Sequence, residues 1–156
     1  MSDESVSAET TVEASTQDVF AVVTDPSRHA GIDGTGWVAE AVDGSPLRGT
    51  GDRFQMAMFH PDHPDGTYET VNEVIAYEQG RAVAWRTGYV DDSGAVVFAG
   101  WWWRYDLVAE GPRRTRVTLT HDWSDVGPGP RAYLSFPVFG DDHLDDSLRH
   151  LSAMLS

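Results

Sequence analysis

The chain has 156 residues, no cysteine, and a formal net charge of −14 from 25 acidic and 11 basic residues. This length predicts a single domain over residues 1–156, and the lack of cysteine excludes disulfides, thiol catalysis and cysteine-based zinc sites. Every basic residue is an arginine, which excludes lysine Schiff-base chemistry, and the acidic balance excludes nucleic acid as an expected partner.

The N-terminal part predicts an edge strand followed by helix. Residues Val6–Val12 alternate, and Ser15 with Asp18 forms a capping-box-like helix start. Asp25-Pro26 ends this helix, and the residues after Pro26 predict a second short one. The first ten residues lack the basic and hydrophobic parts of a secretory signal, and no apolar run is long enough to cross a bilayer. We therefore expect a cytoplasmic protein without membrane insertion.

From Trp37 onward the sequence alternates with period two, which predicts six further antiparallel strands. The first two are Trp37–Val42 and Arg53–His60. Tyr68–Glu78 and Arg81–Tyr89 then form a hairpin with a two-residue turn at Gln79-Gly80. In that register Asn72 pairs with Thr87, Val74 with Trp85 and Ala76 with Val83. The other face then pairs Glu73 with Arg86, a favourable pair of opposite charges.

The stretch Ala99–Ser124 predicts a long hairpin with its turn at Gly111-Pro112. If Leu107 lies opposite Val117, the next pairs on that face are Tyr105 with Leu119, Trp103 with His121, and Trp101 with Trp123. Buried Trp, Tyr and His side chains need hydrogen-bond partners, so an ordinary core favours Leu, Val and Ile instead. An aromatic face with a few polar groups is typical of a small-molecule pocket. A solid aromatic core is the alternative.

The chain ends in a predicted helix from Gly140 to Leu155, with leucines at positions 144, 148, 151 and 155 forming one apolar stripe. Such a stripe predicts a helix packed on the sheet as a lid. The predicted fold class is α+β: a curved, mostly antiparallel seven-stranded sheet wrapped around a long C-terminal helix, with two short helices after the first strand.

Several segments resemble the START-like helix-grip superfamily, in particular its bacterial polyketide cyclase/dehydrase-like branch. They are TVEASTQDVFAVVTDPSRH, GTGDRFQM, RAVAWRT, WRYDL, TRVTLTHDWS and LDDSLRHL. The resemblance covers nearly the whole chain and implies the helix-grip fold. Because this superfamily includes binders, carriers, cyclases and ATPase-activator modules, the resemblance does not assign a reaction. The chain contains no defined catalytic signature, so no catalytic residue is transferred.

We predict that the domain binds or carries a small hydrophobic, aromatic or polycyclic ligand in an internal cavity, without a cofactor, as a monomer or homodimer. The predicted ligand-binding residues are Phe54, Met56, Met58, Asn72, Val74, Trp85, Thr87, Trp103, Tyr105, Leu119, His121, Trp123 and Leu148. Two alternatives remain. One is a cyclase or dehydratase that uses His121 as acid or base, and the other is a protein-interaction module without a functional cavity.

Other motifs predict no further chemistry. His60 and His63, with Asp62 and Asp65, lie on a Pro-rich loop without a third zinc-type ligand, so we expect no metal. His143 and His150 on the final helix are expected at the surface. The sequence has no GxSxG motif and no glycine-rich nucleotide-binding motif between a strand and a helix.

Overall fold

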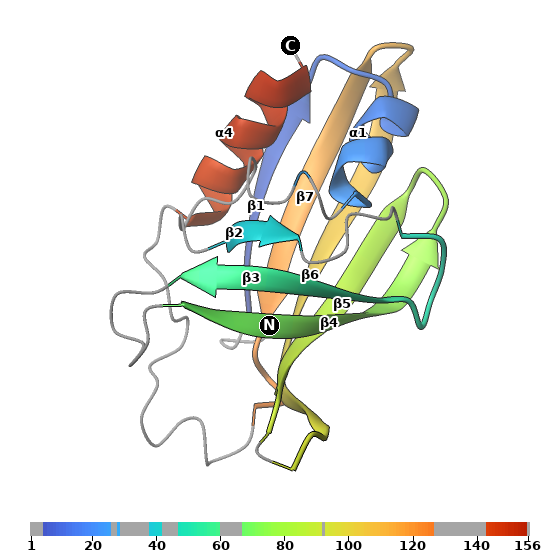
Figure 1. The fold of residues 1–156 in the computed structure, drawn as a ribbon. Coiled ribbons are helices and arrows are strands. Elements are labelled where there is room, and N and C mark those ends of the chain that lie inside the picture. The colour runs from blue at the N-terminus through green and yellow to red at the C-terminus, as the bar shows by residue number, and fades with distance from the viewer. Residues whose placement is uncertain are drawn as a thin grey trace.

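The computed structural model describes residues 5–25, 28, 38–41, 47–59, 67–91, 93–126 and 143–155. A seven-stranded antiparallel sheet with the order β1-β7-β6-β5-β4-β3-β2 forms the body of the protein (Figure 1). The elements are β1 (Ser5–Val12), α1 (Thr16–Val23), β2 (Val38–Ala41), β3 (Arg53–Phe59), β4 (Thr67–Glu78), β5 (Ala82–Val90), β6 (Val96–Gly111), β7 (Arg114–Asp122) and α4 (His143–Leu155). This architecture confirms the predicted fold class.

The helix α1 begins where the sequence predicted. The Ser15 side chain accepts a hydrogen bond of 3.1 Å from the Asp18 backbone N–H, which satisfies one of the free donors of the first turn. Four apolar residues of this helix are buried: Val19, Phe20, Val22 and Val23. The second short helix, predicted after Pro26, lies outside the described residues.

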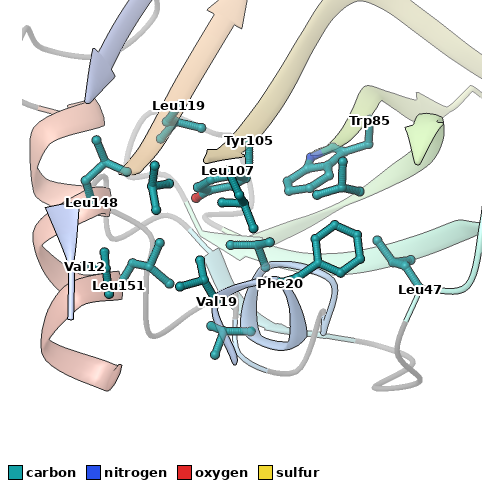
Figure 2. Packing of buried hydrophobic residues seen from close by; sticks show 14 of the residues in the cluster. Val12, Val19, Phe20, Leu47, Trp85, Tyr105, Leu107, Leu119, Leu148 and Leu151 are labelled. Carbon is teal, nitrogen blue, oxygen red and sulfur yellow. The ribbon is translucent and has the colours of Figure 1, made fainter. Parts of the chain in front are cut away.

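The two helices of the described residues pack on one face of the curved sheet, α4 against β1 and β7 and α1 against β6 and β7 (Figure 1). We call this the inner face and the opposite one the outer face. On α4, Leu144, Leu148 and Leu151 are buried, as the apolar stripe predicted. Figure 2 shows Leu148 and Leu151 beside Val12 of the edge strand β1. The predicted helix start at Gly140 lies outside the described residues.

The register of the β6–β7 hairpin is confirmed for the pairs of Trp103 with His121, Tyr105 with Leu119 and Leu107 with Val117. Its turn lies one residue later than predicted, because Gly111 still pairs with Arg114 after a bulge in β6.

The β4–β5 hairpin follows the predicted register only up to Val74, which pairs with Trp85. A bulge at Ile75 then shifts the pairing, so the predicted pair of Ala76 with Val83 is wrong and Tyr77 lies opposite Val83. The turn has three residues rather than two, since Glu78 pairs with Ala82, and Gly80 adopts a φ of 73° there. The shift moves Tyr77 to the inner face, where its ring lies 5.3 Å from that of Phe20.

A larger bulge interrupts β6. Arg86 pairs with Trp102 and Gly88 with Phe98, so Ala99, Gly100 and Trp101 stand opposite the single residue Thr87. Gly100 has a φ of 111°, and a Cβ there would lie 2.4 Å from the Asp125 carbonyl oxygen. The bulge also ends the regular ladder, whose last pair with β7 is Trp102 with Asp122. The predicted pair of Trp101 with Trp123 is therefore not formed.

Candidate functional site

A row of four side chains crosses the inner face over four adjacent strands. His121 on β7 pairs with Trp103 on β6, Trp103 with Trp85 on β5, and Trp85 with Val74 on β4. Paired residues of neighbouring strands project from the same face, so these four side chains lie side by side. The Trp103 and His121 rings are the closest pair, with centroids 4.0 Å apart and planes inclined by 32°.

His121 lies in the interior with 1% of its surface exposed, and both of its ring nitrogens are buried. Its ring also approaches Trp123, with 5.7 Å between centroids. The adjacent Asp122 projects to the other face, where its carboxylate accepts hydrogen bonds from Ser124. The imidazole therefore lies beside two indoles, and its nitrogens can donate or accept a hydrogen bond or transfer a proton.

A second row lies next to the first and contains a buried polar pair. Phe54 on β3 pairs with Asn72 on β4, and Asn72 pairs with Thr87 on β5. The Thr87 hydroxyl donates a 2.7 Å hydrogen bond to Asn72 Oδ1. Asn72 Nδ2 donates to Thr70 Oγ1 over 3.3 Å. Phe54, opposite Asn72, meets the Trp85 ring edge-on with 5.5 Å between ring centroids and so connects the two rows.

The structure brings most of the predicted ligand-binding residues to the inner face. The buried ones are Phe54, Met56, Asn72, Val74, Trp85, Thr87, Tyr105, Leu119, His121, Trp123 and Leu148. Trp103 is half-buried. Met58 on β3 pairs with Tyr68 on β4, but the Met58 side chain is not among those that the structure describes.

Seven of these residues belong to the buried apolar core: Phe54, Met56, Val74, Trp85, Tyr105, Leu119 and Leu148. Leu119 and Leu148 lie in the apolar cluster with Val12 and Leu151, under α4 (Figure 2). Their ligand contact, and the predicted cavity itself, stay predictions. Thr70 was not among the predicted residues, although its spacing of two from Asn72 places it on the same face and would have identified it.

The residues of β6 and β7 that alternate with the site residues face away from the site. Arg104 bonds to Asp106 at 2.9 Å on the outer face, and Thr120, between Leu119 and His121, projects there too. His150 is exposed on α4, as expected. His60, Asp62, His63 and Asp65 lie outside the described residues, and the His143 side chain does too; no group of three metal-binding side chains occurs in the part that is described.

The outer face holds a charged cluster around Glu73. Arg53 and Arg86 both bond to its carboxylate, at 2.9 and 2.6 Å, so the pair predicted from β4 and β5 includes a third residue from β3. These hydrogen bonds, that of Arg53 first, hold the pKa of Glu73 below its usual value despite partial burial. The Arg86 guanidinium also lies 3.8 Å from the centre of the Phe98 ring.

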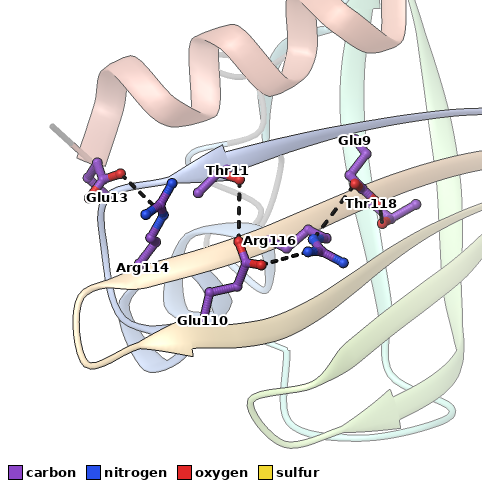
Figure 3. A network of polar contacts seen from close by, with 7 residues as sticks. All are labelled: Glu9, Thr11, Glu13, Glu110, Arg114, Arg116 and Thr118. Atoms are coloured by element: carbon purple, nitrogen blue, oxygen red, sulfur yellow. Dashed lines mark hydrogen bonds and ion pairs between the residues drawn. The ribbon is translucent and has the colours of Figure 1, made fainter.

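A second polar network ties the edge strand β1 to β7 and β6 (Figure 3). Arg116 on β7 forms ion pairs with Glu110 at 2.6 Å and with Glu9 of β1 at 3.7 Å. Arg114 reaches Glu13 at 3.7 Å. In both clusters the arginines are paired with carboxylates away from the inner face.

Comparisons with known proteins agree with this fold. Residues 3–153 match a family described as polyketide cyclase/dehydrase and lipid transport. No curated protein is significantly similar. Protein NE0264 from Nitrosomonas europaea has a similar structure, with a TM-score of 0.70 at 15% identity, covering 99% of this chain and 96% of that one. Protein Ms6760 from Mycobacterium smegmatis gives a TM-score of 0.67 at 18% identity, covering 97% and 90%. At these identities the two structures support the fold alone. Within the described residues, no helix is long and apolar enough to span a membrane.

Proposed function

Because the chain belongs to the polyketide cyclase/dehydrase and lipid transport family, we propose that it binds a small aromatic or polycyclic ligand on the inner face of its sheet. The observation that carries the proposal is the row of Trp85, Trp103 and His121, beside the buried pair of Asn72 and Thr87. Aromatic side chains supply contact area, and a few buried polar groups supply orientation, which is the composition of ligand sites.

Binding is favoured over catalysis by the polar groups of the interior. Those that are buried in the described part of the chain are Thr24, Asn72, Thr87, Thr115, His121 and Ser147. Among these described groups none is a carboxylic acid, and hydroxyl, amide and imidazole groups are suited to hydrogen bonding with a neutral ligand. In the proposal, His121 and Tyr105 act as hydrogen-bonding groups for the ligand. The alternative is a cyclase or dehydratase with His121 as its acid or base.

Two neighbouring tryptophans on β6 allow a matched test of the binding face. Trp103 projects to the inner face, while Trp102 pairs with Arg86 and Asp122 and projects to the outer one. We expect Trp103→Ala to weaken the binding of naphthalene, measured by equilibrium dialysis, at least tenfold. Trp102→Ala is expected to leave the affinity unchanged. Equal losses in both variants, or no saturable binding by the wild type, would contradict the proposal.

His121→Ala separates the proposal from the enzymatic alternative. As a group that orients a ligand, His121 contributes about one hydrogen bond, so its loss is expected to weaken binding by about 1–2 kcal/mol. As an acid or base it would instead change the turnover of a polyketide-like substrate by roughly 10²–10⁴ with little effect on affinity. Native mass spectrometry of freshly purified protein, in search of a copurified small molecule, identifies the natural ligand.

A further inference from the structure

The inner face carries no permanent charge in the part of the chain that the structure describes. Each described arginine is exposed except Arg86 and Arg104, which are half-buried and form ion pairs with Glu73 and Asp106 on the outer face. The sequence has no lysine that could take their place. The buried polar side chains that the structure describes carry hydroxyls, one amide and one imidazole.

This distribution of charge disfavours an anionic ligand. A carboxylate or phosphate placed against Trp85 and Trp103 would lose its hydration without gaining an arginine or lysine partner from the described residues, which is strongly unfavourable. The net charge of −14 adds repulsion during the approach of an anion. A neutral ligand has no charge to desolvate and is not repelled by the negative charge of the protein.

The polar pair on the inner face has unused hydrogen-bonding capacity. Asn72 and Thr87 are 4% and 8% exposed, and their polar contacts within the described residues are the two already given, to each other and to Thr70. One N–H of the Asn72 amide and the acceptor side of the Thr87 hydroxyl therefore remain available. A hydroxyl group complements both, because it accepts from the amide and donates to Thr87.

The pair also stands at a defined place relative to the aromatic row. Thr87 lies on β5, two strands from His121 on β7 and two residues along the strand from its row, which corresponds to roughly 12 Å at the usual spacings. Trp103 occupies the strand between them and Trp85 lies two residues from Thr87. A flat ligand lying on these indoles reaches the polar pair with one end.

Building on the proposed function, we propose that the inner face selects a neutral ligand and that Asn72 and Thr87 bind a hydroxyl group at one end of it. The ligand class is thereby narrowed to hydroxylated aromatic molecules such as phenols, as opposed to fatty acids or other carboxylates.

Three probes with the same ring system test the proposal by equilibrium dialysis at pH 7.5: naphthalene, 2-naphthol and 2-naphthoate. At this pH a phenol is neutral and a carboxylic acid is ionised. We expect 2-naphthol to bind about tenfold more tightly than naphthalene, and 2-naphthoate at least tenfold more weakly.

The isosteric variant Thr87→Val is expected to abolish the advantage of 2-naphthol while naphthalene binds as before, which also shows that the variant is folded. Thr120→Val, which changes an outer-face threonine of β7, is the matched control and is expected to retain the advantage. Binding of 2-naphthoate as tight as that of 2-naphthol would overturn the proposal. Equal binding of 2-naphthol and naphthalene would overturn it too, with the proposed function intact. A failure of all three probes to bind would overturn both.

Discussion

Truncation of Leu148 is expected to show how strongly α4 is held on the sheet. Its side chain is 1% exposed and packs with Leu151, Val12 and Leu119 between helix and sheet (Figure 2). Leu148→Ala removes three carbons from this seam, which at about 0.8 kcal/mol per methylene gives about 2.4 kcal/mol. The residual cavity adds to this because strand and helix residues surround it on both sides, so we expect a total loss of about 3–4 kcal/mol in the free energy of unfolding.

A loss of this size corresponds to a fall in Tm of roughly 6–16 °C for a chain of this length, measurable by calorimetry or circular dichroism. Leu155→Ala is the control, since Leu155 occupies the same stripe of α4 but is only half-buried in the last turn. We expect it to lower the Tm by less than half as much. If the Tm of Leu148→Ala lies within 2 °C of the wild-type value, α4 does not stabilise the sheet. The assignment of the inner face of the sheet would then be wrong too.

Two further substitutions test the outer cluster and the β6 bulge. Because the folded-state pKa of Glu73 lies below its usual value of 4.5, its carboxylate stabilises the fold above that pH, and this stabilisation disappears as the pH falls through the folded-state pKa. Glu73→Gln is therefore expected to lower the free energy of unfolding by about 1 kcal/mol at pH 7, measured by urea unfolding. The difference in unfolding free energy between wild type and variant is expected to shrink below pH 4.5. If that difference does not change with pH, the prediction is wrong. Gly100→Ala is expected to cost about 2–4 kcal/mol because of its positive φ and the close Asp125 carbonyl, whereas Gly49→Ala, which has open space, should change stability by less than about 0.5 kcal/mol. If the two glycine variants have equal urea midpoints, the claim that the bulge at Gly100 requires glycine is wrong.

The parts of the fold that were predictable from the sequence are those in which alternation continues without interruption. The β6–β7 register from Trp103 to Leu107 follows from strict period two together with one turn, so the neighbours of His121 were correct. The start of α1 followed from Ser15 and Asp18, because a capping side chain acts within its own turn.

The errors come from inserted residues. A bulge adds one residue to a strand, so the residues beyond it project from the opposite face. Because Ile75 and Tyr77 are both apolar, the sequence pattern does not show which of them faces the core. Tyr77 therefore reached the core unpredicted, while Ile75 is 41% exposed. At Gly100 the strand passes so close to the Asp125 carbonyl that a Cβ would lie 2.4 Å from it, and a pattern within one strand does not reveal this neighbour. The predicted place of Trp101 failed for the same reason.

The pairing of β1 with β7 bears on the order in which the protein folds. The buried Thr115 hydroxyl donates a 2.7 Å hydrogen bond to the Ala14 carbonyl, 101 residues away in the sequence. Closing a chain loop of that length costs about 4 kcal/mol in entropy before any contact offsets it. The hairpins β4–β5 and β6–β7 close much shorter loops, so we expect them to form early. The free edge of β7 is then available for pairing with β1. The strand β1 then joins this edge late, together with α4 that packs on it, which makes their docking the step that slows folding.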